Sequence, residues 1–257
     1  MTRRIACVFA HPDDDTYGVG GTLALHAGED LELVVLMTTS GESGRILDPS
    51  LATRETLGRV REAEDAAAWR ALGLEPDLRF LRYADGGVAE VPREELVATY
   101  LDGLLAARPQ VVVTFGPDGI TGHPDHVAVG AAATEAFHAA RAAGAGGFDR
   151  LLYVALRRST IDRVDEALRV RGQEPFDPTQ PFQPRGLPDE TVGVVVDCSA
   201  AYDRKLEALR EHRTQGELED VPFDVWPDVL GSESFVIAFP DTDAGGPPLR
   251  DVFEGLA

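Results

Sequence analysis

The chain has 257 residues, 44% of them hydrophobic, which is enough to bury a sizeable core. Its 44 acidic residues outnumber its 24 Lys and Arg residues, and the formal net charge of -20 argues against nucleic acids and anionic membranes as partners, because both attract cationic patches. Cys7 and Cys198 lie in or beside apolar runs, as expected of reduced, buried thiols. With no signal-peptide pattern and no apolar run of membrane-spanning length, we expect a cytoplasmic protein.

The first apolar run, residues 5–10, ends in the polar sequence His11-Pro12-Asp13-Asp14-Asp15. A continuous apolar run without alternation is typical of a strand buried on both faces of a parallel sheet. Ligands of open α/β sheets bind beyond the carboxyl ends of such strands. The sequence therefore predicts a strand that ends in a polar site.

A glycine-rich stretch with a helical pattern follows at residues 16–26. Gly18 and Gly20 match the first two glycines of a dinucleotide-binding loop, but Leu23 stands where that loop needs Gly or Ala. Close packing of a helix on the sheet is therefore favoured over a nucleotide site.

Apolar runs and helical patterns then alternate along the chain. Strands are expected over residues 31–39, 78–81, 111–115, 151–156, 191–196 and 232–239. Helices are expected over residues 53–72, 92–107, from the second histidine cluster to about 143, and 202–212. In the first of these helices, Arg61 and Glu64 have the spacing of a surface ion pair. Residues 157–188 are rich in proline and charge and are expected to cross the surface, where 175–188 would suit a lid or a subunit contact.

Strands that alternate with helices at this rate predict an α/β fold, in which a mostly parallel sheet forms a Rossmann-like, three-layer arrangement. One domain is expected over residues 1–257. The core sheet should lie in residues 1–156, and residues 157–257 should add loops on the substrate side and further strands.

A second polar cluster, His123-Pro124-Asp125-His126, follows the apolar run 111–115. Each of the two His-Pro-Asp units thus stands after a predicted buried strand. Adjacent carboxylates repel one another unless a cation or hydrogen-bond donors compensate. The pair of clusters therefore favours a metal site over two structural loops.

The residue types in the two clusters are those of a hydrolytic zinc site. Such a site takes three protein ligands and keeps one or two positions open for water, a count that His11, Asp14 and His126 satisfy. Asp13 would stay free to accept a proton from the bound water. His123 would lie near the developing oxyanion.

The two clusters also resemble the motifs of the PIG-L/LmbE-like (GlcNAc-PI de-N-acetylase-like) metal-dependent deacetylases, which are written A-H-P-D-D and H-P-D-H. Ala10 completes the first motif. Further similarities span most of the chain, at residues 39–44, 61–64, 71–73, 85–86 and 205–215. The resemblance implies an LmbE-like form of the Rossmann-like fold.

The resemblance implies a zinc-dependent hydrolase, with ferrous iron as the alternative metal, that removes an acyl group, in the first place acetyl, from an N-acetylglucosamine-type sugar or glycoside. Two enzymatic alternatives stay open: an amidase of a thiol-sugar conjugate, and an enzyme that trims an N-acyl sugar on an antibiotic. Outside enzymes, the alternative is a sugar- or nucleotide-binding α/β module. The implied partner is a small N-acyl amino sugar, and a homo-oligomer is compatible with the sequence.

Position by position, the resemblance implies the same metal ligands and the same general base as the residue types do. It further implies that His123 is the electrophilic group, that Asp125 tunes it, and that Arg61 and Asp85 contact the sugar. The family motif usually continues with Glu where this chain has Asp15. If that residue supports the loop, a side chain one methylene shorter must remake its hydrogen bonds.

Overall fold

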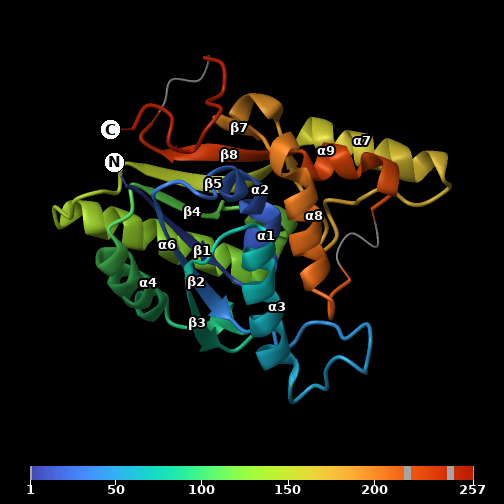
Figure 1. The fold of residues 1–257 in the computed structure, drawn as a ribbon, viewed down its shortest axis with the longest axis horizontal. Helices are drawn as coiled ribbons and strands as arrows, with labels where there is room; N and C mark the ends of the chain where they lie inside the picture. The colour runs from blue at the N-terminus through green and yellow to red at the C-terminus, as the bar shows by residue number, and fades with distance from the viewer. Residues whose placement is uncertain (1, 217–220, 242–245, 257) are drawn as a thin grey trace.

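An eight-stranded sheet forms the centre of the structure, a computed structural model that describes residues 2–216, 221–241 and 246–256 (Figure 1). The strand order is β3-β2-β1-β4-β5-β8-β7, and β6 pairs with β5 beside this path. The strands are β1 Arg3–Phe9, β2 Leu31–Thr39, β3 Asp77–Tyr83, β4 Val111–Phe115, β5 Arg150–Arg157, β6 Gly186–Leu187, β7 Val194–Asp197 and β8 Ser232–Phe239.

The sheet is mostly parallel, which confirms the predicted fold class. β1 lies between β2 and β4 and runs parallel to both, with Ile5 opposite Leu33 on one side and Val111 on the other. β3, β5 and β6 join in parallel, whereas β8 runs antiparallel to β5 and β7. The continuous apolar runs follow from this position, because a central parallel strand is covered on both faces.

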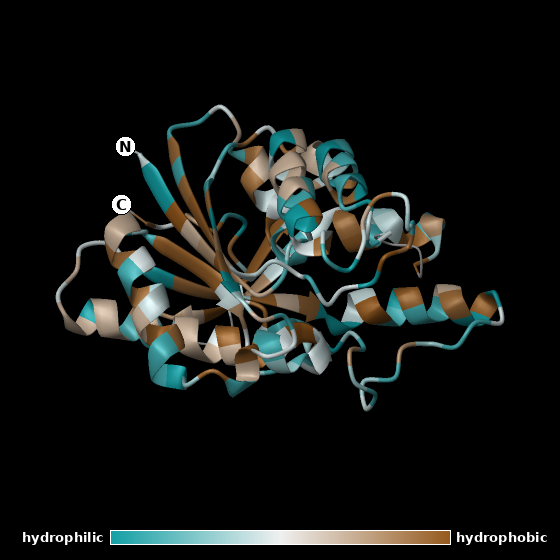
Figure 2. Cartoon of the chain, turned by 90° about the horizontal axis from the view of Figure 1, so that it is seen from below, coloured by the Kyte–Doolittle hydropathy of each residue, from teal (hydrophilic) through white to brown (hydrophobic). Residues whose placement is uncertain are grey.

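Helices cover both faces of the sheet, and its apolar strands lie between them (Figure 2). On one side α4 packs on α6, and on the other side α3 packs on α8 (Figure 1). The helices are α1 Asp14–Gly18, α2 Gly20–Leu25, α3 Leu57–Ala71, α4 Arg93–Ala107, α5 Gly119–Gly122, α6 Pro124–Ala142, α7 Arg158–Val170, α8 Tyr202–Glu211 and α9 Trp226–Leu230.

A glycine sets the approach of α6 to β4. A Cβ added at Gly130 would collide with the carbonyl oxygen of Phe115, so only glycine allows the helix to lie this close to the strand. Gly130 is one turn beyond His126 on α6. This close packing therefore brings the second histidine cluster down to the edge of the sheet.

The sequence pattern predicted that residues 157–188 cross the surface and predicted no helix there. The structure has a helix, α7, at Arg158–Val170. Ile161, Val164 and Leu168 are buried on one side of this helix, at the i, i+3, i+7 spacing of an amphipathic helix. The high charge of the remaining positions hides this stripe when composition is averaged over the segment. Within the described residues, no helix is both long and apolar enough to cross a membrane.

Candidate active site

The predicted site residues follow the carboxyl ends of neighbouring parallel strands. His11 comes two residues after β1, Asp85 two residues after β3, and His123 follows β4 through the short helix α5. The loop 40–44 follows β2. Because these strands are parallel neighbours, the side chains meet at one edge of the sheet, where ligands of open α/β sheets bind.

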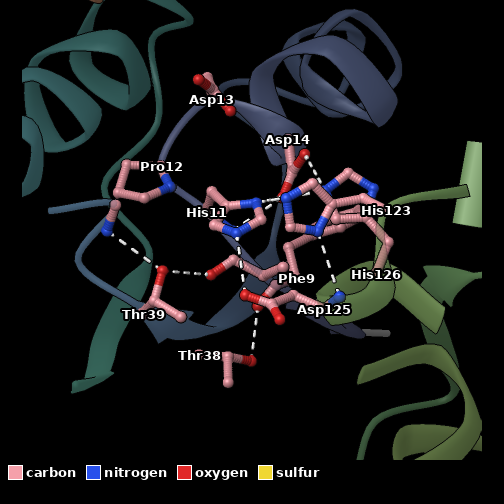
Figure 3. A network of polar contacts seen from close by, with 12 residues as sticks. Phe9, His11, Pro12, Asp13, Asp14, Thr38, Thr39, His123, Asp125 and His126 are labelled. Atoms are coloured by element: carbon pink, nitrogen blue, oxygen red, sulfur yellow. Dashed lines mark hydrogen bonds and ion pairs between the residues drawn. The ribbon is translucent and has the colours of Figure 1, made fainter. Parts of the chain in front are cut away.

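Three side chains, those of His11, Asp14 and His126, converge at this edge (Figure 3). His11 Nδ1 lies 3.2 Å from His126 Nε2 and 3.4 Å from Asp14 Oδ2, and His126 Nε2 lies 3.3 Å from Asp14 Oδ1. Two ligands of a tetrahedral zinc ion, each about 2.0–2.1 Å from the metal, are about 3.3 Å apart. The spacing of the facing atoms of these three side chains therefore fits a single ion.

The outward-facing nitrogens of the two imidazoles fix their orientation. His126 Nδ1 donates to the carbonyl oxygen of Gly119 over 3.1 Å, which leaves the Nε2 lone pair of the neutral ring directed at the cluster. His11 Nε2 faces two carboxylates, at 3.1 Å from Asp85 Oδ1 and 3.4 Å from Asp125 Oδ2. Such outer partners are typical of metal-binding histidines.

The cluster favours a positive charge. Burial by itself lowers the pKa of His11, but the carboxylates of Asp125, Asp14 and Asp85 outweigh it and raise that pKa well above its ordinary value. Burial also lowers the pKa of His126. Burial opposes the ionisation of Asp14, yet His126 and His11 lower its pKa well below the usual range. A cation in the cluster is therefore stabilised by a carboxylate that is already ionised.

Other donor groups lie near the same three residues. His123 is close enough to His11 and His126 to add a third nitrogen, and Asp85 and Asp125 form a second group around His11. Asp125 accepts from the backbone N–H groups of Gly86 and Val88, however, and Asp85 accepts from that of Ser43. Their lone pairs are thus partly used by the backbone.

Arg61 pairs with Asp13, and the predicted surface ion pair with Glu64 is wrong. Arg61 is only 3% exposed and donates to Asp13 Oδ2, at 2.7 Å, and to the carbonyl oxygens of Pro12 and Gly41. Glu64 accepts instead from the backbone and hydroxyl of Thr214 on another segment. Both side chains of the expected pair therefore bind the loops around the site.

Asp13 has an unusual backbone. Its φ of 124° lies in the left-handed region, which costs a residue with a side chain about 1–3 kcal/mol. In Figure 3 its carboxylate lies apart from the imidazoles, yet Asp13 lines the same cavity as His11 and Asp14. Such strain persists only where the surroundings impose it, and here Arg61 supplies that restraint.

His123 and Asp125 interact through the backbone. The N–H of Asp125 donates to His123 Nδ1 over 3.1 Å, so the neutral ring carries its proton on Nε2. Burial, together with His11 and His126, lowers the pKa of His123 and keeps the ring neutral. The carboxylate of Asp125 faces His11 instead of His123. The structure therefore offers an N–H donor at His123 Nε2.

Asp15, where the chain departs from the family motif, is fully buried behind the site. It accepts from the backbone N–H of Thr16 and from the indole N–H of Trp69, both over 2.7 Å. Burial raises the pKa of Asp15 to about 6. Sequence reasoning missed both Trp69 and the neighbouring carboxyl of Asp65, which share α3 with Arg61 and carry no local motif.

A cavity of about 340 Å³ contains most of the predicted residues. It is lined by His11, Asp13, Asp14, Arg61, Asp85, His123 and His126, together with Ser43, Gly44, Gly86 and Gln215. Asp125 is buried beneath it. The structure thus brings seven of the eight predicted residues to one polar cavity and places the eighth against His11.

A parallel sheet with a cluster of His and Asp donors at its carboxyl edge defines the class, α/β proteins with a candidate metal centre. The family model described as PIG-L, GlcNAc-PI de-N-acetylase, matches residues 6–137. A 1D-myo-inositol 2-acetamido-2-deoxy-alpha-D-glucopyranoside deacetylase of Geodermatophilus obscurus is 34% identical, over 99% of this chain and 98% of the relative. The chain belongs to the PIG-L family.

A further relative supports this assignment, and two solved structures share the fold. The deacetylase of the same name from Tsukamurella paurometabola is 34% identical over the whole of both chains. A protein of Thermus thermophilus has a similar structure, with a TM-score of 0.63 and 28% identity over 94% of this chain and 97% of that one. The N,N'-diacetylchitobiose deacetylase of Pyrococcus horikoshii, at 22% identity, shares the fold with a TM-score of 0.62 over 91% and 83% of the two chains.

Proposed function

We propose that this protein is a zinc-dependent N-deacetylase that hydrolyses the acetamide of an N-acetylglucosamine-type glycoside. The observation that carries the proposal is the convergence of three side chains that line a polar cavity and whose facing donor atoms lie 3.2–3.4 Å apart. The curated relatives at 34% identity, which are named as deacetylases of such a glycoside, support the same reaction and substrate class.

His11, Asp14 and His126 would hold the metal. Their facing atoms have the spacing of one tetrahedral ion, the outer nitrogen of His126 donates to the carbonyl oxygen of Gly119, and that of His11 lies 3.1 Å from Asp85 Oδ1. Nitrogen and carboxylate donors suit zinc and also accept ferrous iron. When bound, the metal polarises the amide carbonyl and lowers the pKa of the attacking water toward about 7.

Asp13 is the proposed general base. It lines the cavity beside Asp14, and its carboxylate is not among the facing donor atoms of His11, Asp14 and His126. In the proposed reaction it accepts a proton from the attacking water and then returns that proton to the leaving amine. Arg61 Nη2 donates to this carboxylate over 2.7 Å and holds it in place.

His123 is the proposed electrophilic group. Its Nε2–H is free to donate to the oxyanion that develops on the amide oxygen, because the N–H of Asp125 occupies Nδ1. Asp125 thus positions His123 through its backbone and His11 through its carboxylate. Arg61 and Asp85, which line the cavity, are the proposed contacts of the sugar hydroxyls.

Amine release from methyl glycosides of N-acetylglucosamine tests this function. The purified protein should release glucosamine glycoside, lose activity after chelation, and regain it when zinc is restored. N-acetylgalactosamine glycosides and a cysteine-sugar amide serve as comparison substrates. Binding of the glycoside without any amine release, at full zinc occupancy, would instead identify a non-catalytic sugar-binding module.

A further inference from the structure

A second cavity, also of about 340 Å³, opens from the same donor cluster. It shares Asp14 and His126 with the polar cavity, but its other walls come from different elements. The polar cavity is bounded by the loops after β2 and β3, whereas the second one extends over the end of β5 and along α7. The proposed metal position therefore lies between the two cavities, and the second one is called the apolar chamber below.

The walls of this second cavity are predominantly apolar. Val154 and Leu156 are two residues apart and lie on one face of β5, and Ile161 and Val164 are three residues apart on α7. A Cβ added at Gly18 would come within 3.1 Å of Val154 Cγ2, so glycine at this position keeps the wall clear. Ile120, Phe176, Pro184, Val221 and Val229 complete the apolar lining, and Tyr17, Arg45, Thr121 and Thr160 contribute polar groups.

We propose that this apolar chamber holds the acyl group of the substrate and that the enzyme prefers linear acyl chains longer than acetyl. The inference rests on the proposed function. The carbonyl carbon of an amide carries its nitrogen and its acyl carbon on different sides. When the carbonyl lies beside Asp14 and His126, which both cavities share, one substituent extends into each cavity. Arg61, Asp85 and Gln215 suit the hydroxyl-rich amine, which leaves the apolar chamber for the acyl chain.

The chemical step is unchanged by chain length. Water forms a C–O bond to the carbonyl carbon, the C–N bond breaks, and the proton taken from water goes to the amine, which yields a carboxylic acid and an amino sugar. An acetyl methyl group, about the size of one water molecule at roughly 30 Å³, would occupy only a small part of the chamber. Each further buried methylene should raise kcat/KM up to about fourfold, which corresponds to about 0.8 kcal/mol.

An acyl series on one amine tests the inference. The zinc-loaded protein is assayed with methyl glucosaminides that carry acetyl, butyryl, hexanoyl or octanoyl groups on nitrogen. We expect kcat/KM for the hexanoyl substrate to exceed that for the acetyl substrate at least tenfold. Equal or falling values along the series, with the acetyl substrate hydrolysed, would overturn the inference and leave the proposed function standing.

Variants of the chamber give an internal comparison. Leu156→Trp fills the cavity beside the end of β5 and should reduce the hexanoyl-to-acetyl ratio of kcat/KM at least fivefold. Ile161→Phe, which fills the cavity from α7, should have the same effect. Because the ratio is taken within one variant, a change in the folded fraction cancels. Val170→Trp lies on the same helix but is 75% exposed and outside the cavity, so its ratio should stay that of the wild type.

A second arm separates the acyl group from the other apolar part that a substrate can carry. Methyl and octyl glycosides of N-acetylglucosamine place the apolar chain on the sugar side of the amide. A gain with the octyl glycoside that Leu156→Trp abolishes, without a gain along the acyl series, would assign the chamber to the aglycone and overturn the inference. Failure to hydrolyse any N-acyl substrate would refute the proposed function instead.

Discussion

Arg61 Nη2 donates to Asp13 Oδ2 over 2.7 Å, so a buried guanidinium from α3 holds the carboxylate that we propose as general base. The same nitrogen donates to the carbonyl oxygen of Pro12, and Nη1 donates to that of Gly41. Arg61 thus joins the loop after β1 to the loop after β2. The position of the base depends on a residue about fifty positions away in the sequence.

Replacement of Arg61 should therefore impair turnover more than metal binding. Arg61→Lys keeps the charge but lacks the planar guanidinium that donates to Pro12, Asp13 and Gly41 at once. A displaced Asp13 carboxylate should then lower kcat on the order of a hundredfold. Zinc content, measured by elemental analysis, should stay near one equivalent. Arg59→Lys, an exposed position on the same helix, is the control and should change neither quantity. Unchanged kcat in Arg61→Lys would show that Asp13 needs no such anchor.

Gly41 should be required for the observed position of the Arg61 side chain. A Cβ added at Gly41 would collide with Arg61 Nη1, and the φ of 64° adds strain. We expect Gly41→Ala to lower kcat at least tenfold by displacing the guanidinium. Gly28→Ala is a matched control, because Gly28 has a φ of 88° and nothing within 4 Å of an added Cβ. An equal effect of the two substitutions would attribute the loss to backbone strain alone.

The buried carboxyl of Asp65 should make stability depend on pH. Burial and the neighbouring Asp15 raise the pKa of Asp65 well above its ordinary value. The folded state therefore keeps a proton that the unfolded chain releases above about pH 4, so the free energy of unfolding falls as pH rises from the unfolded pKa toward the folded one. Asp65→Asn, which does not titrate, should lose less stability between pH 5 and 7 than the wild type.

Urea unfolding of both proteins in excess chelator measures this difference, since chelation removes the pH dependence of metal binding. Parallel stability curves for the wild type and Asp65→Asn would show that Asp65 is already ionised in the folded protein.

The buried ion pair between Lys205 and Glu233 should stabilise the fold. Lys205 Nζ donates to Glu233 Oε1 over 2.6 Å and to the carbonyl oxygen of Tyr17 over 2.8 Å, while Glu233 accepts from the backbone of Gly21 and Thr22. Lys205→Met would leave a buried carboxylate without its cation. We expect a loss of about 3–5 kcal/mol in the free energy of unfolding, measured by urea titration.

Arg210→Met, at an exposed position of α8, provides the comparison, because its ion pair with Glu207 is open to solvent. Such pairs contribute about 0–1 kcal/mol. Similar losses in Lys205→Met and Arg210→Met would contradict the role assigned to the buried pair.

Periodicity and strand-end motifs were enough to predict the sheet and most of the residues around the cavity. The predicted strands 31–39 and 232–239 agree with β2 and β8 in full, since both runs are apolar and bounded by polar loops. The predicted residues His11, Asp14 and His126 meet because parallel neighbours end at one edge. The residue types and the family resemblance named these candidates, and the predicted topology placed them together.

Contacts between distant segments could not be predicted in the same way. Local spacing suggested that Arg61 would pair with Glu64, but each side chain has a loop partner that only the packing of α3 provides. The carboxylate of Asp125 turns to His11, although the family resemblance implied that it would tune His123. α7 was missed because its narrow apolar stripe is surrounded by charge.

The adjacent aspartates Asp13 and Asp14 allow the most direct test of the division between base and ligand. Asp13→Asn and Asp14→Asn are isosteric changes one residue apart, and both proteins are assayed for bound zinc and for amine release. The account predicts about one zinc per Asp13→Asn protein with turnover reduced on the order of a thousandfold, and strongly weakened zinc binding in Asp14→Asn. Near-normal turnover in Asp13→Asn, or wild-type zinc affinity in Asp14→Asn, would contradict it.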